Sequence, residues 1–310
     1  MSHLAFLFPG QGSQSVGMGR GFYESSPQAK EVFAKADEIL NFRLSQICFE
    51  GPEERLKLTE ITQPAILTVS YIAYALLGMR PDMAAGHSIG EYSALVAAGA
   101  LRFEDAVLLV HKRGRYMQEA VPVGKGAMAA VLGVDYQTIE QALSEVKVGT
   151  VEIANWNSQE QIVIAGQREA VEKALELINP PRSVMLPVSA PFHCSLMKEA
   201  AERLSRDLDE VEFRDLEFPI ITNVDARVIH EGDAARDALK RQVSRPVLWC
   251  RAMEMLFEKG VDVFVELGRG KVLSGIAKRM GRTLSAPLTV VNVEDEPTLR
   301  QVKEELSGIL

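Results

Sequence analysis

Residues 86–90 read Gly-His-Ser-Ile-Gly, a G-x-S-x-G pattern that could hold a nucleophilic serine. The pattern follows a short apolar stretch and opens a helix-like run at residues 91–100. A sharp strand-to-helix turn of this kind exposes the serine hydroxyl, and its glycines let the backbone bend. A helix that starts there also directs N–H groups at the oxygen that becomes negative during acyl transfer. Ser88 is therefore the candidate nucleophile, although small residues also fill turns for structural reasons alone.

A serine hydroxyl needs a base that removes its proton, so the fold must bring a histidine to Ser88. His193 is the candidate, because it lies where the inserted segment described below returns to the main chain pattern. The alternative is that His193 only starts a helix. An acidic third member cannot be chosen from the sequence, and a backbone or amide carbonyl could orient the imidazole instead. The other histidines lie at the terminus, beside the serine, inside a helix and in an exposed turn: His3, His87, His111 and His230.

Arg113 lies on the apolar face of the helix expected at residues 103–119. A guanidinium on a core-facing stripe must have a partner, because an unpaired buried charge is very costly. One interpretation is a structural partner among the Asp and Glu side chains. The other is a substrate carboxylate bound through two N–H groups at once. The sequence favours neither. The apolar stripe consists of Phe103, Ala106, Val107, Val110 and Met117.

Two glycine-rich loops lack a nucleotide signature. The loop at 10–12 has no third glycine at G-x-G-x-x-G spacing, and the loop at 268–271 is followed by Val272 where a Walker A loop needs Ser or Thr. Gln11 leaves the first expected strand, so its backbone N–H could face that of Ile89 as an oxyanion-binding pair. The alternative is that Gln11 belongs only to a turn.

The composition narrows the class of protein. The chain has 310 residues, of which 47% are hydrophobic, and a net charge of −8, which argues against nucleic acid as the main partner. Its three cysteines show no C-x-x-C spacing, so we expect neither a disulfide framework nor a metal site. The N-terminus has no cationic leader, and the apolar region 65–79 is too short and polar to span a bilayer. We expect a cytoplasmic monomer that is not bound to a membrane.

The elements expected around these residues alternate in the manner of an α/β fold. A continuous apolar run at 4–8, ended by Pro9-Gly10, predicts a buried strand. The same reasoning predicts helices at 27–40, 63–77, 91–98 and 103–119, with a short strand before Ser88. After residue 190 it predicts a helix at 195–208, strands at 218–223 and 261–267, and a helix at 271–280.

The rhythm changes between Pro122 and Pro191, which predicts an inserted subdomain. The expected order there is β-α-β-β-α-β, the ferredoxin-like unit. We therefore expect one subdomain at 1–122 with 191–310, a smaller one at 123–190, and a site in the cleft between them. The elements of the insert are strands at 127–132, 151–155, 161–165 and 183–188, and helices at 136–146 and 169–178.

Six motifs run along the chain: Phe8-Pro9-Gly10-Gln11-Gly12-Ser13-Gln14, Thr62-Gln63-Pro64-Ala65, Gly86-His87-Ser88-Ile89-Gly90-Glu91-Tyr92-Ser93, Lys112-Arg113-Gly114 with Met117-Gln118, Asn157-Ser158, and Ser189-Ala190-Pro191-Phe192-His193. Together and in this order they resemble the malonyl-CoA:acyl carrier protein transacylase family. The resemblance covers the chain almost end to end, from Phe6 through the segment 266–268.

This resemblance implies an α/β-hydrolase-like large subdomain with an inserted ferredoxin-like one, in agreement with the pattern above. It also implies that Ser88 is acylated and that His193 is the general base and acid. Arg113 would bind the free malonyl carboxylate, and the backbone N–H groups of Gln11 and Ile89 would form the oxyanion hole.

The resemblance further implies that the main-chain carbonyl of Gln242 orients the histidine, so that a Ser-His dyad replaces a triad. Phe192 is bulky where relatives that accept methylmalonyl have a smaller residue, so we expect malonyl to be preferred over methylmalonyl. The implied reaction is ping-pong transfer of malonyl from malonyl-CoA to holo-acyl carrier protein in fatty acid biosynthesis, with no cofactor beyond the carrier's phosphopantetheine.

Two alternatives share the same serine and histidine: a transacylase of a polyketide pathway, and a serine hydrolase that passes the acyl group to water. A buried Arg113 argues against a simple esterase. Arg269 stands where family members usually carry Pro. With its basic neighbours it could form a docking surface for an acidic carrier protein, although a solvated helix face is the alternative reading. These neighbours are Lys271, Lys278, Arg279 and Arg282.

Overall fold

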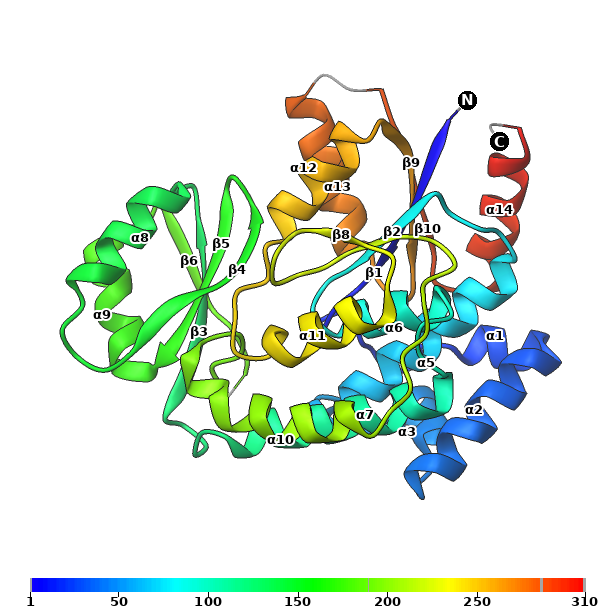
Figure 1. Cartoon of the computed structure of the whole chain (residues 1–310), viewed down its shortest axis with the longest axis horizontal. Coiled ribbons are helices and arrows are strands. Elements are labelled where there is room, and N and C mark those ends of the chain that lie inside the picture. The colour runs from blue at the N-terminus through cyan, green and yellow to red at the C-terminus, as the bar shows by residue number, and fades with distance from the viewer. Residues whose placement is uncertain (1, 189, 285–286, 309–310) are drawn as a thin grey trace.

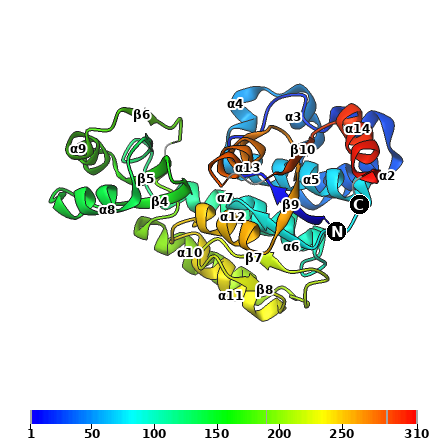
Figure 2. The same cartoon turned by 90° about the horizontal axis from the view of Figure 1, so that it is seen from above.

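The structure is a computed structural model of the chain and describes residues 2–188, 190–284 and 287–308. Ser189, which begins the sixth motif, lies outside the described residues, as do Met1, Ser285, Ala286, Ile309 and Leu310 of the expected large subdomain. The fold is mixed α/β with two separate sheets, one of six strands and one of four. In both views the four-stranded sheet and its helices form a lobe at one end of the molecule (Figures 1 and 2). The sequence prediction of an α/β fold is confirmed.

The six-stranded sheet is mainly parallel and carries the site at the carboxyl ends of its central strands. Its order is β10-β9-β1-β2-β7-β8, and only the pair β7 and β8 is antiparallel. Ligands bind at such carboxyl ends in open parallel sheets. The strands are β1 (His3–Phe8), β2 (Met83–Gly86), β7 (Ile220–Ile221), β8 (Val228–Ile229), β9 (Val261–Leu267) and β10 (Thr289–Val293).

Helices cover both faces of this sheet because its strands are apolar on both sides. Along β1, Phe6 belongs to the core shared with α2, α5, α6, α7 and α14, whereas Leu7 belongs to the core shared with α12 and α13. The helices of this part are α1 (Arg20–Ser25), α2 (Pro27–Leu40), α3 (Leu44–Glu50), α4 (Glu53–Leu56), α5 (Thr59–Leu77), α6 (Ile89–Ala97), α7 (Phe103–Glu119), α10 (Lys198–Asp209), α11 (Gly232–Gln242), α12 (Trp249–Glu258), α13 (Val272–Thr283) and α14 (Glu296–Ser307).

The second sheet is antiparallel, with the strand order β4-β5-β3-β6. Successive residues of a strand point to opposite faces: Ala129 packs in the core that contains residues of α8 and α9, whereas Met128 faces the main core and the site. This small sheet therefore supplies one wall of the site. Its elements are β3 (Gly126–Leu132), α8 (Tyr136–Glu145), β4 (Val151–Ser158), β5 (Gln161–Gln167), α9 (Arg168–Ile178) and β6 (Arg182–Met185).

Most of the expected elements occur, with bounds that differ by a few residues. Strand β6 ends at Met185 rather than at 188, because the backbone N–H of Val188, the next one that could donate to β3 after that of Leu186, bonds the carbonyl of Leu186 instead. The expected strand 218–223 is regular only at Ile220–Ile221. The expected helix 195–208 begins as a 3₁₀ turn, Ser195–Met197, before α10. Eight observed elements lie where none was expected from the sequence: α1, α3, α4, β8, α11, α12, β10 and α14.

Candidate active site

Ser88 occupies the turn between β2 and α6, and its backbone is strained. Its φ is 53° and its ψ is −109°, a conformation that L-residues rarely adopt. The flanking glycines make the turn possible because other backbone lies against them. A Cβ atom on Gly86 would lie 1.9 Å from the carbonyl oxygen of Gly90, and one on Gly90 would lie 2.1 Å from that of Phe8. The glycines of the pattern therefore serve a close approach of backbone, as the nucleophile interpretation requires.

His193 lies within hydrogen-bond distance of Ser88. Its Nε2 is 2.7 Å from Ser88 Oγ, and its Nδ1 is 3.0 Å from the main-chain oxygen of Gln242. A carbonyl can only accept, so Nδ1 carries the proton and Nε2 is free to accept one from the serine. Burial, and next the positive charge of Arg113, lowers the pKa of His193 to about 3. The imidazole is therefore neutral at physiological pH, the form that a general base needs.

The guanidinium of Arg113 is buried beside the serine, with 1% of the residue exposed. Arg113 lies one turn of α7 after Val110, a residue of the apolar stripe. Its Nη1 donates to Gln63 Oε1 at 2.8 Å. Its Nη2 donates to Ser88 Oγ at 3.1 Å and to Gln242 Oε1 at 2.9 Å.

These partners of Arg113 are two amides and a hydroxyl, not a carboxylate. Among the described residues, no Asp or Glu oxygen forms an ion pair with it within 4.0 Å, and its Nε–H has no hydrogen-bond partner. A structural counter-ion, one of the two interpretations of this residue, is therefore not found in direct contact. The cation keeps donor capacity for a ligand, and burial lowers its pKa.

The remaining predicted site residues surround the serine. Gln11 follows β1, and its side chain donates weakly to Thr59 Oγ1 at 3.4 Å. Ile89 is the first residue of α6, where backbone N–H groups have no partner inside the helix. Both residues line a small cavity of about 110 Å³ that also contains Ser88. Its wall further includes Gln63, His87, Arg113, Met117, Met128, Asn155, Leu186, Val188, Phe192 and His193.

The structure thus brings together six of the predicted residues around one cavity, with Gln242 directly behind His193. The family model of the acyl transferase domain matches residues 5–299. The chain belongs to the acyl transferase family. The malonyl-CoA:acyl carrier protein transacylase resemblance of the motifs is confirmed by its relatives.

Two curated relatives of this acyl transferase are named malonyl CoA-acyl carrier protein transacylase. The relative from Bacillus subtilis is 46% identical, and the match covers 98% of this chain and 99% of the relative. The relative from Escherichia coli K12 is 47% identical, and the match covers 92% of this chain and 95% of the relative. The solved transacylase of Coxiella burnetii superimposes with a TM-score of 0.94 at 39% identity over 98% of both chains. A malonyl-transacylase in complex with a type II PKS acyl-carrier protein matches with the same TM-score at 41% identity, over 98% of this chain and all of that one.

Three further polar residues support this site and were not among the predicted site residues. Gln63 accepts a hydrogen bond from Arg113. Asn223 binds the Ser88 elbow, the sharp turn at residues 86–90 that carries Ser88, and Glu91 accepts a hydrogen bond from Gln242. A usable signal existed for Glu91, the only charged residue in the sequence of α6, where it lies in the first turn. Asn223 follows β7, which pairs with β2 as Ala85 with Ile221, and this neighbourhood is visible only once the strand order is known.

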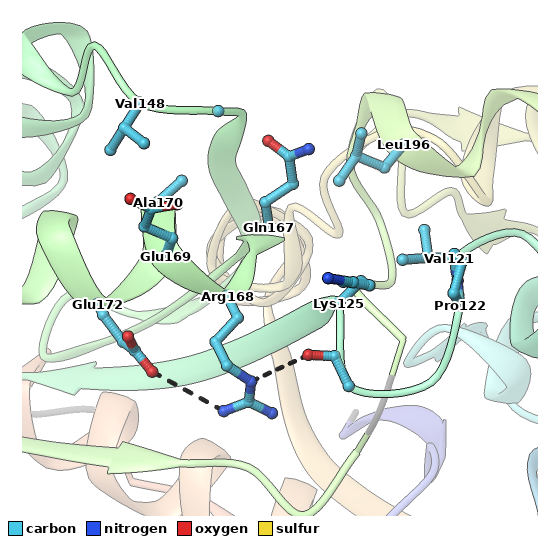
Figure 3. A pocket seen from close by; sticks show the side chains of 12 residues that line it. Val121, Pro122, Lys125, Val148, Gln167, Arg168, Glu169, Ala170, Glu172 and Leu196 are labelled. Carbon is cyan, nitrogen blue, oxygen red and sulfur yellow. Dashed lines mark hydrogen bonds and ion pairs between the residues drawn. The ribbon is translucent and has the colours of Figure 1, made fainter.

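A second, larger hollow of about 660 Å³ lies where α7 ends and β3 and α9 begin. Figure 3 shows its lining, including Lys125 and Arg168, with the guanidinium of Arg168 directed at Glu172 and the carbonyl of Gly124. None of Ser88, His193 and Arg113 lines it. The candidate nucleophile Ser88 and the candidate base His193 meet in the smaller cavity, which is therefore the candidate active site.

The predicted basic surface is divided. Arg269 bonds Ser15 Oγ at 3.0 Å and Glu294 at 3.2 Å, so it ties two loops together. Lys278, Arg279 and Arg282 are exposed on α13. Within residues 2–188, 190–284 and 287–308, no cluster of three or more His, Cys, Asp or Glu residues could hold a metal ion, and no helix has the length and apolarity that a membrane crossing needs.

Proposed function

We propose that this acyl transferase moves malonyl from malonyl-CoA to the phosphopantetheine thiol of holo-acyl carrier protein, through a malonyl ester of Ser88. The observation that carries the proposal is the buried Arg113, which contacts the nucleophile and has no carboxylate partner among the described residues. A substrate with a distal carboxylate supplies that missing partner. An acetyl group does not, so it leaves the desolvated cation unpaired.

In the first half-reaction, His193 Nε2 takes the proton of Ser88 as Oγ attacks the thioester carbonyl. The oxygen that becomes negative is bound by the backbone N–H groups of Gln11 and Ile89. The C–S bond then breaks, and His193 returns the proton to the sulfur of CoA. The products are the malonyl ester of Ser88 and free CoA.

The second half-reaction reverses these steps with a different thiol. The carrier's phosphopantetheine thiol gives its proton to His193 and attacks the ester carbonyl, and Ser88 leaves with that proton. In both halves the carbonyl of Gln242, 3.0 Å from Nδ1, stabilises the transient imidazolium. A Ser-His dyad oriented by a carbonyl replaces a triad.

Arg113 can bind the malonyl carboxylate without losing its framework contacts. Its guanidinium has five N–H donors, and Gln63 and Gln242 accept two of them. In the free enzyme one Nη2–H donates to Ser88 Oγ. Once Oγ becomes an ester oxygen it is a weaker acceptor, so this hydrogen bond is weakened. That N–H is then available to the carboxylate. The Nε–H has no acceptor within hydrogen-bond distance among the described residues and lies beside the Tyr92 side chain. Phe192 on the cavity wall supports a preference for malonyl over methylmalonyl.

We further propose an α/β-hydrolase-like subdomain of residues 1–122 and 191–310 and a ferredoxin-like insert of residues 123–190. The element order β3-α8-β4-β5-α9-β6 and the sheet order β4-β5-β3-β6 support the insert. We expect a monomer that needs no cofactor or metal. A cytoplasmic location is supported by three free, buried cysteines, Cys48, Cys194 and Cys250.

The pathway we propose is fatty acid biosynthesis. Polyketide synthesis is the second candidate, favoured by the relative solved with a type II PKS acyl-carrier protein. The third reading of the sequence, a serine hydrolase, accounts neither for the buried Arg113 nor for relatives that are named transacylases.

Isotope exchange tests the proposed reaction. The purified chain is mixed with malonyl-CoA and labelled CoA, with no carrier protein present. A ping-pong enzyme forms labelled malonyl-CoA under these conditions, because the malonyl ester can react back with CoA. Exchange that requires carrier protein contradicts the covalent mechanism, and release of free malonate in place of exchange indicates a hydrolase.

A further inference from the structure

A buried carboxylate, Glu91, lies behind the nucleophile and has no part in the chemistry described above. Only 1% of the residue is exposed. One of its oxygens, Oε2, accepts the backbone N–H of Asn223 at 3.1 Å and the side-chain N–H of Gln242 at 2.7 Å. The other oxygen, Oε1, has no hydrogen-bond partner among the described residues. A single carboxylate oxygen therefore connects two segments that are far apart in the sequence.

The first of these segments holds the strained elbow. Asn223 Oδ1 accepts the backbone N–H of Ser88 at 2.6 Å, and its Nδ2 donates to the carbonyl of Gly86 at 2.6 Å. The orientation of this amide is fixed. If it were reversed, its NH₂ group would face the N–H of Ser88 and its oxygen would face the carbonyl oxygen of Gly86. One side chain thus holds the backbone on both sides of His87, and a strained backbone persists only where its surroundings fix it.

The second segment orients the base. Gln242 accepts from His193 through its main-chain oxygen, while its side-chain Nε2 donates to the carbonyl of Ser88 at 3.0 Å as well as to Glu91. Its Oε1 accepts from Arg113. Both polar atoms of the Gln242 side chain are hydrogen-bonded. Its position is therefore fixed by Glu91 on one side and by the carbonyl of Ser88 and by Arg113 on the other.

We propose that Glu91 and Asn223 are positioning residues. Through its two hydrogen bonds, Glu91 Oε2 sets the distance between the Ser88 elbow and Gln242, whose carbonyl orients His193. This inference rests on the proposed function, because it assigns the network to acyl transfer at Ser88. The role needs an acceptor at the position of Oε2 and does not need a charge. Glu91→Gln keeps an acceptor there, and its amide nitrogen takes the place of the unpartnered Oε1.

The experiment measures single-turnover acylation of the full chain by malonyl-CoA. It yields two quantities, the acylation rate at saturating malonyl-CoA and the malonyl-CoA concentration that gives half of this rate. For Glu91→Ala we expect the saturated rate to fall about 100-fold, the loss that a misplacement of about 1 Å can cause. The half-saturating concentration should change less than about 3-fold, because Arg113 keeps its bond to Gln63. Glu91→Gln should stay within about 3-fold of wild type in both quantities.

Glu266→Ala is the matched control, because Glu266 is also a buried carboxylate that accepts two backbone N–H groups, at the start of α13. It should lower stability without changing the acylation rate of folded enzyme. Asn223→Ala, expected to be slow like Glu91→Ala, tests the same network if the latter fails to fold.

The inference is wrong if folded Glu91→Ala or Asn223→Ala acylates at the wild-type rate. It is also wrong if Glu91→Gln is as slow as Glu91→Ala, since the charge would then matter, or if the Glu266 control is equally slow. A wild-type enzyme that forms no malonyl ester contradicts the proposed function itself, and this result is distinct from the others.

Discussion

Replacing Arg113 by Ala separates substrate recognition from structural support. In the free enzyme this guanidinium is bonded to Gln63, Ser88 and Gln242, and its Nε–H has no acceptor among the residues that the structure describes. With malonyl bound, we expect two charged hydrogen bonds to the carboxylate, each contributing about 1.5–3 kcal/mol. Their loss amounts to about 3–6 kcal/mol, which lowers kcat/KM for malonyl-CoA by a factor of about 10² to 10⁴.

For acetyl-CoA the same substitution has the opposite expected sign. Acetyl leaves the buried cation of wild type unpaired, and Arg113→Ala removes that penalty. We therefore expect kcat/KM for acetyl-CoA to rise or stay level, so that the preference for malonyl over acetyl collapses. Gln242 keeps its bonds to Glu91 and to the carbonyl of Ser88, which should hold the dyad in place.

The assay is the steady-state transfer of each acyl group to holo-acyl carrier protein, with circular dichroism as the measure of folding. Arg115→Ala is the control on the same helix, because that side chain is exposed and pairs with Glu119 at 3.9 Å. The reasoning is refuted if folded Arg113→Ala loses malonyl and acetyl transfer by the same factor. Arg113 would then support the dyad and would not read the substrate.

Three further predictions concern stability, specificity and docking. Burial raises the pKa of Glu91 from 4.5 to about 7, so the folded state binds its proton more tightly than the unfolded state and stability falls as pH rises between those values. Glu91→Gln lacks this loss, which is worth up to about 3 kcal/mol; urea unfolding of both proteins at pH 5 and pH 8 measures it, and parallel pH dependences would contradict it. Phe192→Ala should enlarge the cavity and raise methylmalonyl transfer about 10-fold relative to malonyl; competition between the two CoA esters measures this ratio, and an unchanged ratio removes Phe192 from specificity. Reversing the charge of Lys278 and Arg279 should raise KM for carrier protein several-fold but not KM for malonyl-CoA; equal KM values for carrier protein would discard the docking surface.

Local sequence patterns were sufficient for the parts of the site that depend on neighbouring residues. The turn around Ser88 follows from the glycines at 86 and 90. At both positions other backbone atoms lie about 2 Å from where a Cβ atom would be, so only glycine fits. The burial of Arg113 follows from the helical period of α7. His193 was chosen by elimination and by its place at the end of the insert, and its distance to the serine agrees with that choice.

The parts that the sequence could not provide depend on strand order and on side-chain packing. Asn223 reaches the elbow because β7 lies beside β2, and no spacing in the sequence encodes that neighbourhood. Gln242 was identified by resemblance only, because it acts on His193 through a main-chain oxygen, which every residue type has. The amide partners of Arg113 could not be predicted either, because Gln63 and Gln242 carry no charge that would mark them in the sequence as partners of a buried cation.

The central claim is that Ser88 carries the malonyl group, and the mass of the intact protein tests it most directly. Wild type, Ser88→Ala and Arg113→Ala are incubated briefly with malonyl-CoA and then with holo-acyl carrier protein. We expect a malonyl adduct on wild type, none on Ser88→Ala and little on Arg113→Ala, with transfer of the adduct to the carrier. An adduct that persists in Ser88→Ala, or one that decays to malonate and ignores the carrier, would contradict the account.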